Sequence, residues 1–278
     1  MQWNEIPKLI DPVAFSIGNF NIYWYSLSYL SAFFVVYFLL YGEVRSDKET
    51  VFSKFGKPKT ELFDFLMLCF LGVILGGRLG YIIFYDLSGF FANPISFLVP
   101  FQDGSFVGFY GMSFHGGLIG VILTTVWYAK KNKLKFFDLA NFVVPAIPLG
   151  YFFGRIGNFM NGELFGRPTK SFIGMRFPKD DLGLLRHPSQ LYEALGEGIL
   201  LFIIILFLQK KKMLKNHALA LFLFFYGAIR FVIEFAREPD PHLGFILWEL
   251  TTGQILCIGM MISGILVYYY STKTKKDD

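Results

Sequence analysis

Long apolar runs separated by short polar stretches dominate this chain of 278 residues. The runs lie near residues 22–42, 62–84, 113–129, 136–156, 189–208, 217–235 and 246–270, and the third run is the shortest. A helix needs about 20 residues to cross the hydrocarbon core of a bilayer. The pattern therefore predicts an all-α membrane protein with seven transmembrane helices.

The composition supports a membrane protein throughout. Hydrophobic residues make up 54% of the chain, Phe occurs 35 times, and the mean hydropathy is +0.48. These values lie outside the usual mix of soluble globular domains. The sequence shows no long-period repeat and no inverted pair of halves, which transporters often have. We therefore expect a single membrane domain over residues 1–278.

Lys and Arg are unevenly divided between the two sides of the predicted bundle. Segments 43–61, 130–135, 209–216 and the tail after residue 270 together hold sixteen, whereas the opposite side holds seven. Cytoplasmic loops carry an excess of Lys and Arg. The amino terminus is therefore expected outside and the carboxyl terminus in the cytoplasm. The basic inner face accounts for the net charge of +5 and suits contact with membrane lipids; no nucleic-acid motif is present.

Three arginines lie within the predicted spans: Arg78, Arg155 and Arg230. Burying them in hydrocarbon would cost roughly 8–10 kcal/mol, so intramembrane charges indicate a functional site. The orientation places all three near the outer ends of their spans. Arg78, six residues from the end of its span, is expected roughly 9 Å below the outer boundary. No carboxylate at helical spacing pairs with Arg78 or Arg155, so the pattern predicts a site for a lipid phosphate.

The sixth span carries a polar stripe. Tyr226, Arg230 and Glu234 recur at intervals of four residues, and Arg237 follows seven residues after Arg230, so the four are expected on one inward face. Two interpretations stay open. Arg230 and Glu234 could simply neutralise each other inside the bundle, or Arg230 could bind an anion.

A histidine and a group of amides complete the candidate chemistry. His115 opens the third span, and histidine changes charge near neutral pH, as a base or proton shuttle must. Asn158, Asn161 and Glu163 follow Arg155. They could satisfy backbone groups where the helix breaks and also bind substrate. Whether His115 removes a proton or only orients substrate stays open.

Several glycines recur every fourth residue, a spacing that favours close helix packing. They are Gly72, Gly76 and Gly80, with the pairs Gly116/Gly120 and Gly150/Gly154. Both cysteines lie inside apolar runs, where a free thiol behaves as a small hydrophobic group. The four histidines are scattered without ligand spacing, so no metal or cofactor is expected.

Other classes of membrane protein fit less well. A transporter of anions or lipids should continue its polar path to the inner side, but the inner halves of the spans are nearly uncharged. An intramembrane serine protease would need Ser113 and His115 to meet, yet residues two apart face different directions on a helix. A CDP-alcohol phosphotransferase would need paired aspartates, and the spans show none. A structural scaffold would not need three arginines at one depth.

Five segments carry a resemblance to one known family. They are GRIGNFMNGELFG at 154–166, GGRLGYIIFY at 76–85, MSFHGGLIG at 112–120, HPSQLYEA at 187–194 and YGAIRFVIEFAREPD at 226–240. In sequence and order they resemble the phosphatidylglycerol:prolipoprotein diacylglyceryl transferases. The segments span nearly the whole chain, and the first is highly specific.

The resemblance implies a seven-helix enzyme of the bacterial cytoplasmic membrane, with its active site towards the outer leaflet. Such an enzyme moves the diacylglyceryl group of phosphatidylglycerol onto the lipobox cysteine of a prolipoprotein signal peptide, leaving a thioether and releasing glycerol 1-phosphate. We assign His115 and Arg230 as candidate catalytic residues. Candidate substrate-binding residues are Arg155, Tyr25, Arg78, Asn158, Asn161, Glu163, Gly166, Tyr226, Glu234 and Arg237.

The residue types suit that reaction. Guanidinium groups are always charged and offer bidentate donors to a leaving phosphate. Attack requires a thiolate, and a free cysteine with a pKa of about 8.5 is only a few per cent ionised near neutral pH. A base such as His115, or a strong positive field, is therefore expected.

Overall fold

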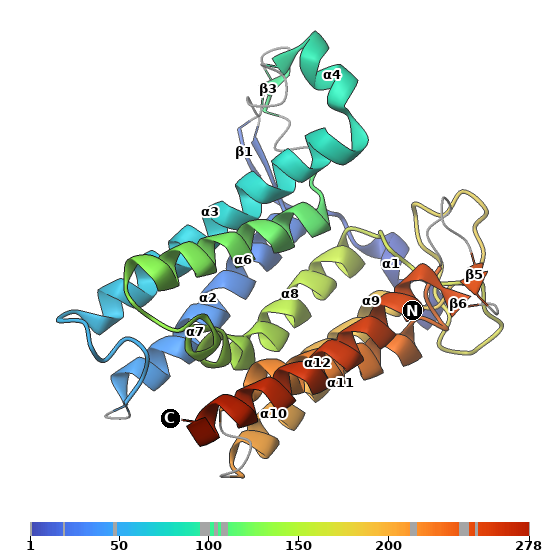
Figure 1. Ribbon diagram of the computed structural model, residues 1–278. Helices are drawn as coiled ribbons and strands as arrows, with labels where there is room; N and C mark the ends of the chain where they lie inside the picture. Colours follow the sequence, from blue (N-terminus) through green and yellow to red (C-terminus); the bar gives the residue numbers. More distant parts are fainter. Residues whose placement is uncertain are drawn as a thin grey trace. The chain divides into compact units, whose positions relative to one another are not determined.

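The computed structural model describes residues 2–18, 20–46, 49–94, 101–102, 105–106, 111–211, 216–238, 245–247 and 250–277. For residues 101–102, 105–106, 245–247 and 274–277 it describes the backbone alone. Most described residues are helical (Figure 1). The helices are η1 (Trp3–Glu5), α1 (Ile6–Leu9), α2 (Trp24–Arg45), α3 (Pro58–Tyr85), α4 (Leu87–Ala92), α6 (Phe114–Lys131), α7 (Phe136–Val143), η2 (Val144–Ala146), α8 (Ile147–Met160), α9 (Ser189–Glu193), η3 (Ala194–Leu200), α10 (Leu201–Gln209), α11 (Ala218–Ile233) and α12 (Thr252–Asp277).

Sheet is limited to three antiparallel hairpins, each of two strands. The first pairs β1 (Val13–Ile17) with β2 (Phe20–Tyr23), the second β3 (Phe101–Gln102) with β4 (Ser105–Phe106), and the third β5 (Phe245–Leu247) with β6 (Leu250–Thr251). The chain is thus mostly helical rather than strictly all-α.

Five helical segments among the described residues are long and apolar enough to cross a membrane. They are Trp24–Arg45, Pro58–Tyr85, Phe136–Met160, Ser189–Gln209 and Thr252–Lys273. They correspond to the first, second, fourth, fifth and seventh predicted spans. The third and sixth predicted spans coincide with α6 and with the shorter apolar helix α11. A multi-pass helical protein is therefore confirmed, whereas the number seven and the orientation stay predictions.

Two predicted boundaries were wrong. The seventh span was placed at 246–270, but the backbone at 245–247 and 250–251 forms the β5–β6 hairpin and α12 starts only at Thr252; residues 248 and 249 lie outside the described ranges. Residues 22 and 23 of the predicted first span belong to β2. A short apolar run alone cannot distinguish a strand from the first turn of a helix.

The chain divides into two compact units, which are described separately. The smaller unit is Tyr41–Ala140, in which α3 and α6 lie side by side (Figure 1). Their contact runs along the predicted glycines. A Cβ at Gly76 would overlap the carbonyl oxygen of Gly116, and one at Gly120 would overlap that of Gly72. Close packing through these glycines is confirmed, because only a missing side chain lets the two backbones approach so far.

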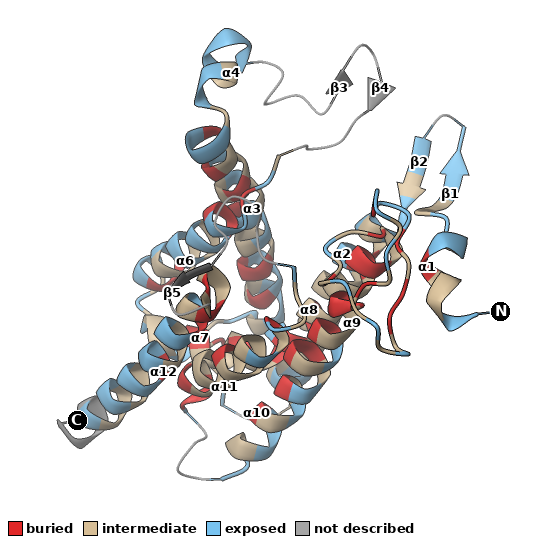
Figure 2. Ribbon diagram, turned by 90° about the vertical axis from the view of Figure 1, so that its right-hand side faces the viewer, coloured by how far each residue is buried: buried red, intermediate tan, exposed pale blue. Residues whose placement is uncertain are grey.

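The larger unit combines Met1–Leu40 with Asn141–Asp278. Here α11 packs against α12, and α8 packs against α9 and η3. A Cβ at Gly150 would overlap Val36 on α2, which confirms close packing there. A Cβ at Gly154 would meet no atom within 4 Å, so the prediction of close packing at Gly154 was wrong. Buried residues gather in α8 and α9, while α12 is exposed along much of its length (Figure 2). Exposed apolar side chains such as Leu256 and Ile262 suit a surface in contact with lipid.

A folded segment, residues 161–188, connects α8 to α9. Its apolar side chains Met175 and Phe177 pack on Phe159 in a small buried core. The guanidinium of Arg186 donates to both carboxylate oxygens of Asp180, at 2.8 and 3.1 Å. Arg186 also pairs with Glu238, 3.2 Å away. The segment is therefore held by a core of its own and by charge-assisted hydrogen bonds, and it follows directly on the end of α8.

We expect the local stability of residues 180–187 to depend on pH through the carboxyl group of Asp180. The hydrogen bonds from Arg186 hold the pKa of that carboxyl below its ordinary value. A lowered pKa stabilises the folded form above the unfolded value, about 3.9, and the contribution disappears as pH falls through the folded pKa. Asp180→Asn should speed amide exchange of this peptide roughly tenfold or more at about pH 6. Hydrogen exchange with mass spectrometry measures it, with exposed Asp181→Asn as the control. Equal protection in both variants at about pH 6 would contradict this role of Asp180.

Candidate active site

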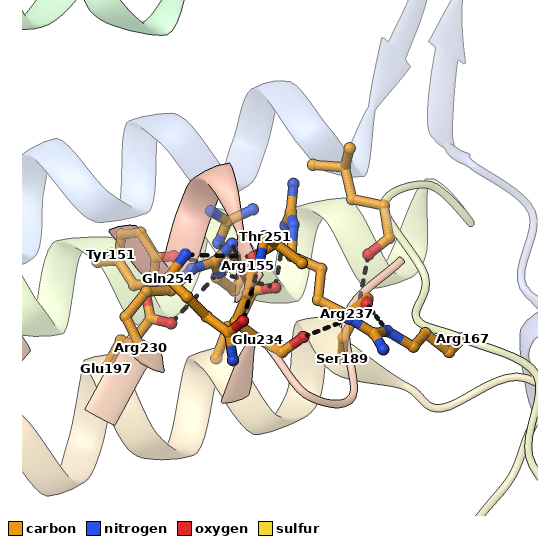
Figure 3. A network of polar contacts seen from close by, with 12 residues as sticks. Tyr151, Arg155, Arg167, Ser189, Glu197, Arg230, Glu234, Arg237, Thr251 and Gln254 are labelled. Carbon is orange, nitrogen blue, oxygen red and sulfur yellow. Dashed lines mark hydrogen bonds and ion pairs between the residues drawn. The ribbon is translucent and has the colours of Figure 1, made fainter. Parts of the chain in front are cut away.

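Glu193, the last residue of α9, lies at the centre of a buried ionic cluster. Figure 3 shows Arg155, Arg230 and Arg237, the three arginines of this cluster. The side chain of Glu193 is fully buried and contacts three guanidinium groups. Oε2 lies 2.7 Å from Nε of Arg155. Oε1 lies 3.3 Å from Nη1 of Arg230 and 3.1 Å from Nη1 of Arg237. One carboxylate therefore brings together arginines from α8, α11 and the turn after α11.

Arg230 is the most heavily paired of the three arginines. Besides Glu193, its Nη1 lies 3.4 Å from Oε1 of Glu197 in η3, and its Nη2 lies 2.8 Å from Oε2 of Glu234. Thr251 donates from its hydroxyl to the other oxygen of Glu234, at 3.2 Å. The predicted Arg230–Glu234 pair is present, but it is only one part of a larger cluster.

The cluster is balanced in formal charge, and its arginines are less buried than its carboxylates. The guanidiniums of Arg155, Arg230 and Arg237 face the carboxylates of Glu193, Glu197 and Glu234, three charges of each sign. Glu193 and Glu197 have no exposed side-chain surface, whereas the three arginine side chains are 17%, 12% and 18% exposed. The carboxylates therefore lie beneath the arginines, and the accessible surface of the cluster is cationic.

Aromatic rings support the cluster from the side. The guanidinium of Arg155 lies 4.7 Å from the centroid of the Tyr151 ring, and the Tyr151 hydroxyl donates to Glu193 at 3.3 Å. The rings of Tyr151 and Tyr226 meet edge to face with centroids 6.0 Å apart. Tyr226, a predicted site residue, thus helps to fix the ring on which Arg155 rests.

Amide side chains orient Arg155 from the end of α8. Nη1 of Arg155 donates to Oδ1 of Asn158 at 3.2 Å, and Nδ2 of Asn158 donates to Glu163 at 2.9 Å. Asn161 donates to the second oxygen of Glu163 at 2.8 Å. Because Asn158 gives its amide hydrogens to Glu163, its carbonyl oxygen is turned towards Arg155. The three predicted residues therefore form one chain of hydrogen bonds.

Gly166 and Arg237 meet where residues 166–167 pass between α9 and the end of α11. Gly166 forms an antiparallel bridge with Arg237 and donates its N–H to His187 at 2.8 Å. The backbone N–H of Arg167 donates to Ala236 at 2.9 Å. A Cβ at Gly166 would overlap the carbonyl oxygen of Ala236. Position 166 therefore has no room for a side chain beside Arg237. Burial also lowers the pKa of the neighbouring His187 imidazole.

Two details of the predicted site were wrong. Arg155 was expected to lack a carboxylate partner on a helix, yet Glu193 lies 2.7 Å away, because α8 packs against α9 and brings residues far apart in sequence together. Arg237 was expected to continue the helical face of Arg230, but α11 ends at Ile233. Arg237 reaches the cluster from a turn instead.

The remaining candidate residues come from both units. Tyr25, at the start of α2, shares a hydrogen bond of 3.0 Å with Tyr29, and its Cα approaches Gly157 of α8. Arg78 and His115 belong to the Tyr41–Ala140 unit. Nη1 of Arg78 donates to the carbonyl oxygen of Gly111 at 3.1 Å.

His115 is exposed near the start of α6. The preceding Ser113 caps that helix by accepting a hydrogen bond from Gly116, which occupies the hydroxyl in a structural role.

The candidate site residues assigned from the sequence did not include Glu193 or Glu197. The signal was present, because both are carboxylates inside an otherwise apolar run and are four residues apart, on one face of a helix. Within the described ranges, no group of three His, Cys, Asp or Glu side chains has the geometry to hold a metal ion.

A family model described as prolipoprotein diacylglyceryl transferase matches residues 12–270. The chain belongs to the prolipoprotein diacylglyceryl transferase family. The match extends over both compact units and includes every candidate residue named above. Membership of this family confirms the resemblance drawn from the five sequence segments.

Individual relatives agree with the family match. A phosphatidylglycerol–prolipoprotein diacylglyceryl transferase of Chlorobaculum tepidum is 44% identical over 273 residues, which cover 97% of this chain and 92% of the relative. Enzymes of the same name from Bordetella bronchiseptica and Rickettsia canadensis are 44% and 46% identical. These alignments cover 95% of this chain, with 96% of the first enzyme and 97% of the second. Similarity to prolipoprotein diacylglyceryl transferases therefore extends over nearly the full length.

Proposed function

We propose that this protein transfers the diacylglyceryl group of phosphatidylglycerol to the lipobox cysteine of a prolipoprotein signal peptide, the first step of lipoprotein maturation. The observation that carries the proposal is the cluster of Arg155, Arg230 and Arg237 around Glu193, in a chain of the prolipoprotein diacylglyceryl transferase family. A cationic surface held by buried carboxylates suits a lipid with an anionic phosphodiester headgroup.

The reaction exchanges one bond at a glyceryl carbon. The cysteine sulfur attacks the carbon that carries the phosphate ester, a C–S bond forms, and the C–O bond to phosphate breaks. The bonding electrons leave with the phosphate oxygen as glycerol 1-phosphate, and the thiol proton passes to a base. Negative charge therefore grows on the phosphate group in the transition state, where fixed guanidinium donors stabilise it most.

Arg155 and Arg230 are assigned to that phosphate. Arg230 is held on both edges of its guanidinium, by Glu234 on Nη2 and by Glu193 and Glu197 on Nη1. Arg155 is held by Glu193 and Asn158. Such fixed orientation means that little reorganisation is needed when substrate arrives. Asn161, Glu163, Gly166, Tyr226 and Arg237 then act by keeping these donors in place.

His115 is assigned as the base and Arg78 as a further contact for the lipid headgroup. A histidine can accept a proton near neutral pH, and His115 is exposed near the start of α6. Tyr25, beside the end of α8, is assigned to substrate binding. No cofactor takes part in this scheme, because the thiolate supplies the new C–S bond and the phosphate group leaves with the electrons of the broken C–O bond.

We further propose seven transmembrane helices in the bacterial cytoplasmic membrane, with the amino terminus outside and the active site towards the outer leaflet. The sixteen-to-seven distribution of Lys and Arg supports this orientation. It places segment 161–188 and the arginine cluster on the side from which phosphatidylglycerol of the outer leaflet and an exported signal peptide approach.

Cysteine labelling tests the orientation. In a background without Cys69 and Cys257, a cysteine replacing exposed Lys170 should react with an impermeant thiol reagent applied to intact spheroplasts. A cysteine replacing exposed Lys210 should react only after the membrane is opened. The charge bias of the loops gives this expectation. The reverse pattern would place the cluster on the cytoplasmic side.

Reconstitution tests the proposed reaction. Purified protein in vesicles of phosphatidylglycerol should convert a lipobox peptide into its diacylglyceryl thioether and release glycerol phosphate in equal amounts. Vesicles of phosphatidylcholine and a peptide with Ser in place of the lipobox Cys serve as controls. Absence of both products with active-site residues intact would overturn the proposal.

A further inference from the structure

Glu197 lies in an unusual helical segment. Residues Ala194–Leu200 form a π-helix of seven residues between α9 and α10, and single π-turns of this kind recur at functional sites. The segment is wedged between two helices. A Cβ at Gly198 would meet Phe152 of α8, and one at Gly196 would meet Ile229 and Ile233 of α11. Glu197 is therefore fixed beneath the cluster, with its side chain fully buried.

Glu197 contacts the cluster through Arg230, whose Nη1 donates a hydrogen bond to Oε1 of Glu197. Its ion pair is the longest, 3.4 Å to Nη1 of Arg230, against 2.8 Å between Arg230 and Glu234. Oε2 of Glu197 is buried and makes no well-oriented hydrogen bond to a described residue. Arg230 shares the same Nη1 with Glu193 at 3.3 Å. This edge of Arg230 is therefore shared between two carboxylates.

The substrate and the released product differ in charge. A phosphodiester carries one negative charge, whereas a phosphate monoester carries nearly two at neutral pH, because its second pKa is about 6. Three arginines without compensation would therefore hold the product more tightly than the substrate. Three carboxylates reduce the formal charge of the cluster to zero. A carboxylate that competes with the phosphate group for one edge of an arginine would therefore favour release of the phosphate monoester.

We propose that Glu197 competes with the phosphate group for Nη1 of Arg230 and so favours release of the phosphate monoester over binding of the phosphodiester. Glu197 is a positioning residue in this scheme, because it acts through Arg230 and does not contact the reacting carbon. The inference rests on the function proposed above. It assigns product release to a residue outside the candidate set.

The substitution Glu197→Gln tests the competition, since it keeps the shape of the side chain and removes its charge. The cluster then gains one net positive charge. Coulomb energy scales with the charge of the ligand, so the dianion gains about twice as much as the monoanion. If the Kd for phosphatidylglycerol falls about threefold, the Kd for glycerol 1-phosphate should fall about tenfold.

Both constants are measurable without turnover. Titration calorimetry with glycerol 1-phosphate, and with phosphatidylglycerol in mixed micelles, gives the two values for wild type and variant. In the transfer assay, the inhibition constant of glycerol 1-phosphate should fall about tenfold and kcat should fall with it, whereas KM for phosphatidylglycerol should fall less. Glu197→Asp, which keeps the charge, should restore most of the wild-type inhibition constant.

Glu238→Gln is the matched control, because Glu238 pairs with Arg186 outside the cluster and should leave all these constants unchanged. Equal constants in wild type and Glu197→Gln would overturn the inference. Weaker binding of both ligands would also overturn it, since Glu197 would then support Arg230 rather than compete for it. Failure of the proposed function is a different result, namely a wild-type protein that forms no thioether.

Discussion

Replacing Arg230 by Lys is expected to lower the transfer rate by roughly 10²–10³-fold while the protein still folds and inserts. Lys keeps a positive charge beside Glu193, Glu197 and Glu234, so the formal charge of the cluster is unchanged. It loses the planar fork that spans these partners, and a single ammonium cannot donate along two edges. Removing one fixed donor to developing charge costs an effect of this size. The initial rate of thioether formation, with size-exclusion chromatography for folding, measures it.

Arg155→Lys should behave in the same way and should also weaken binding of phosphatidylglycerol. Arg155 joins Glu193 through Nε and Asn158 through Nη1 while its plane rests on Tyr151, and an ammonium cannot reproduce that arrangement. Lys130→Gln, at an exposed position of the other unit, is the control and should be silent. Full activity in both Arg→Lys variants would contradict this role of the planar guanidinium groups. The arginines would then contribute only their positive charge.

The second large effect is expected at His115. Replacing it by Gln keeps a side chain that can form hydrogen bonds but removes the group that accepts a proton near neutral pH. If His115 is the base, turnover should fall roughly 10²–10⁴-fold. Binding of phosphatidylglycerol should survive, because the arginine cluster is untouched.

A pH profile separates the two roles left open for His115. The rate of the Gln variant should rise with pH as more of the peptide thiol ionises without help, since a free cysteine has a pKa of about 8.5. Supplying the peptide already as thiolate, at about pH 9.5, should therefore recover part of the lost rate. A variant with near-normal turnover at all pH values would reduce His115 to an orienting group.

The elements that depend on local sequence were predictable. Apolar runs fix the approximate helices because their length matches the bilayer, and the Arg230–Glu234 pair follows from the spacing of four residues on one helix. The glycine contacts between α3 and α6 were predictable for the same reason, since small residues at this spacing make a continuous ridge.

The centre of the site was not predictable in this way. Glu193 joins Arg155 and Arg237 across 38 and 44 residues of sequence, and that meeting depends on how α8, α9 and the end of α11 pack. No periodicity within one helix encodes such a contact. The π-helical segment at 194–200 was not predictable either. Its glycines fit against Phe152 and Ile229, and these contacts depend on the packing of other helices rather than on the local sequence.

The backbone bridge at residues 166–167 has a consequence for the order in which the chain is assembled. Gly166 and Arg167 bond to His187 on one side and to Ala236 and Arg237 on the other, up to 70 residues further along the chain. A ribosome has therefore made most of the protein before this bridge can close. The earlier contacts of the loop after α8 include those with the amino-terminal residues, such as the hydrogen bond from Arg176 to Asn4. The same late part of the chain brings Arg230 to Glu193 and closes the backbone bridge at Gly166 and Arg167, so the arginine cluster and this bridge both depend on synthesis of α11 and the residues that follow it.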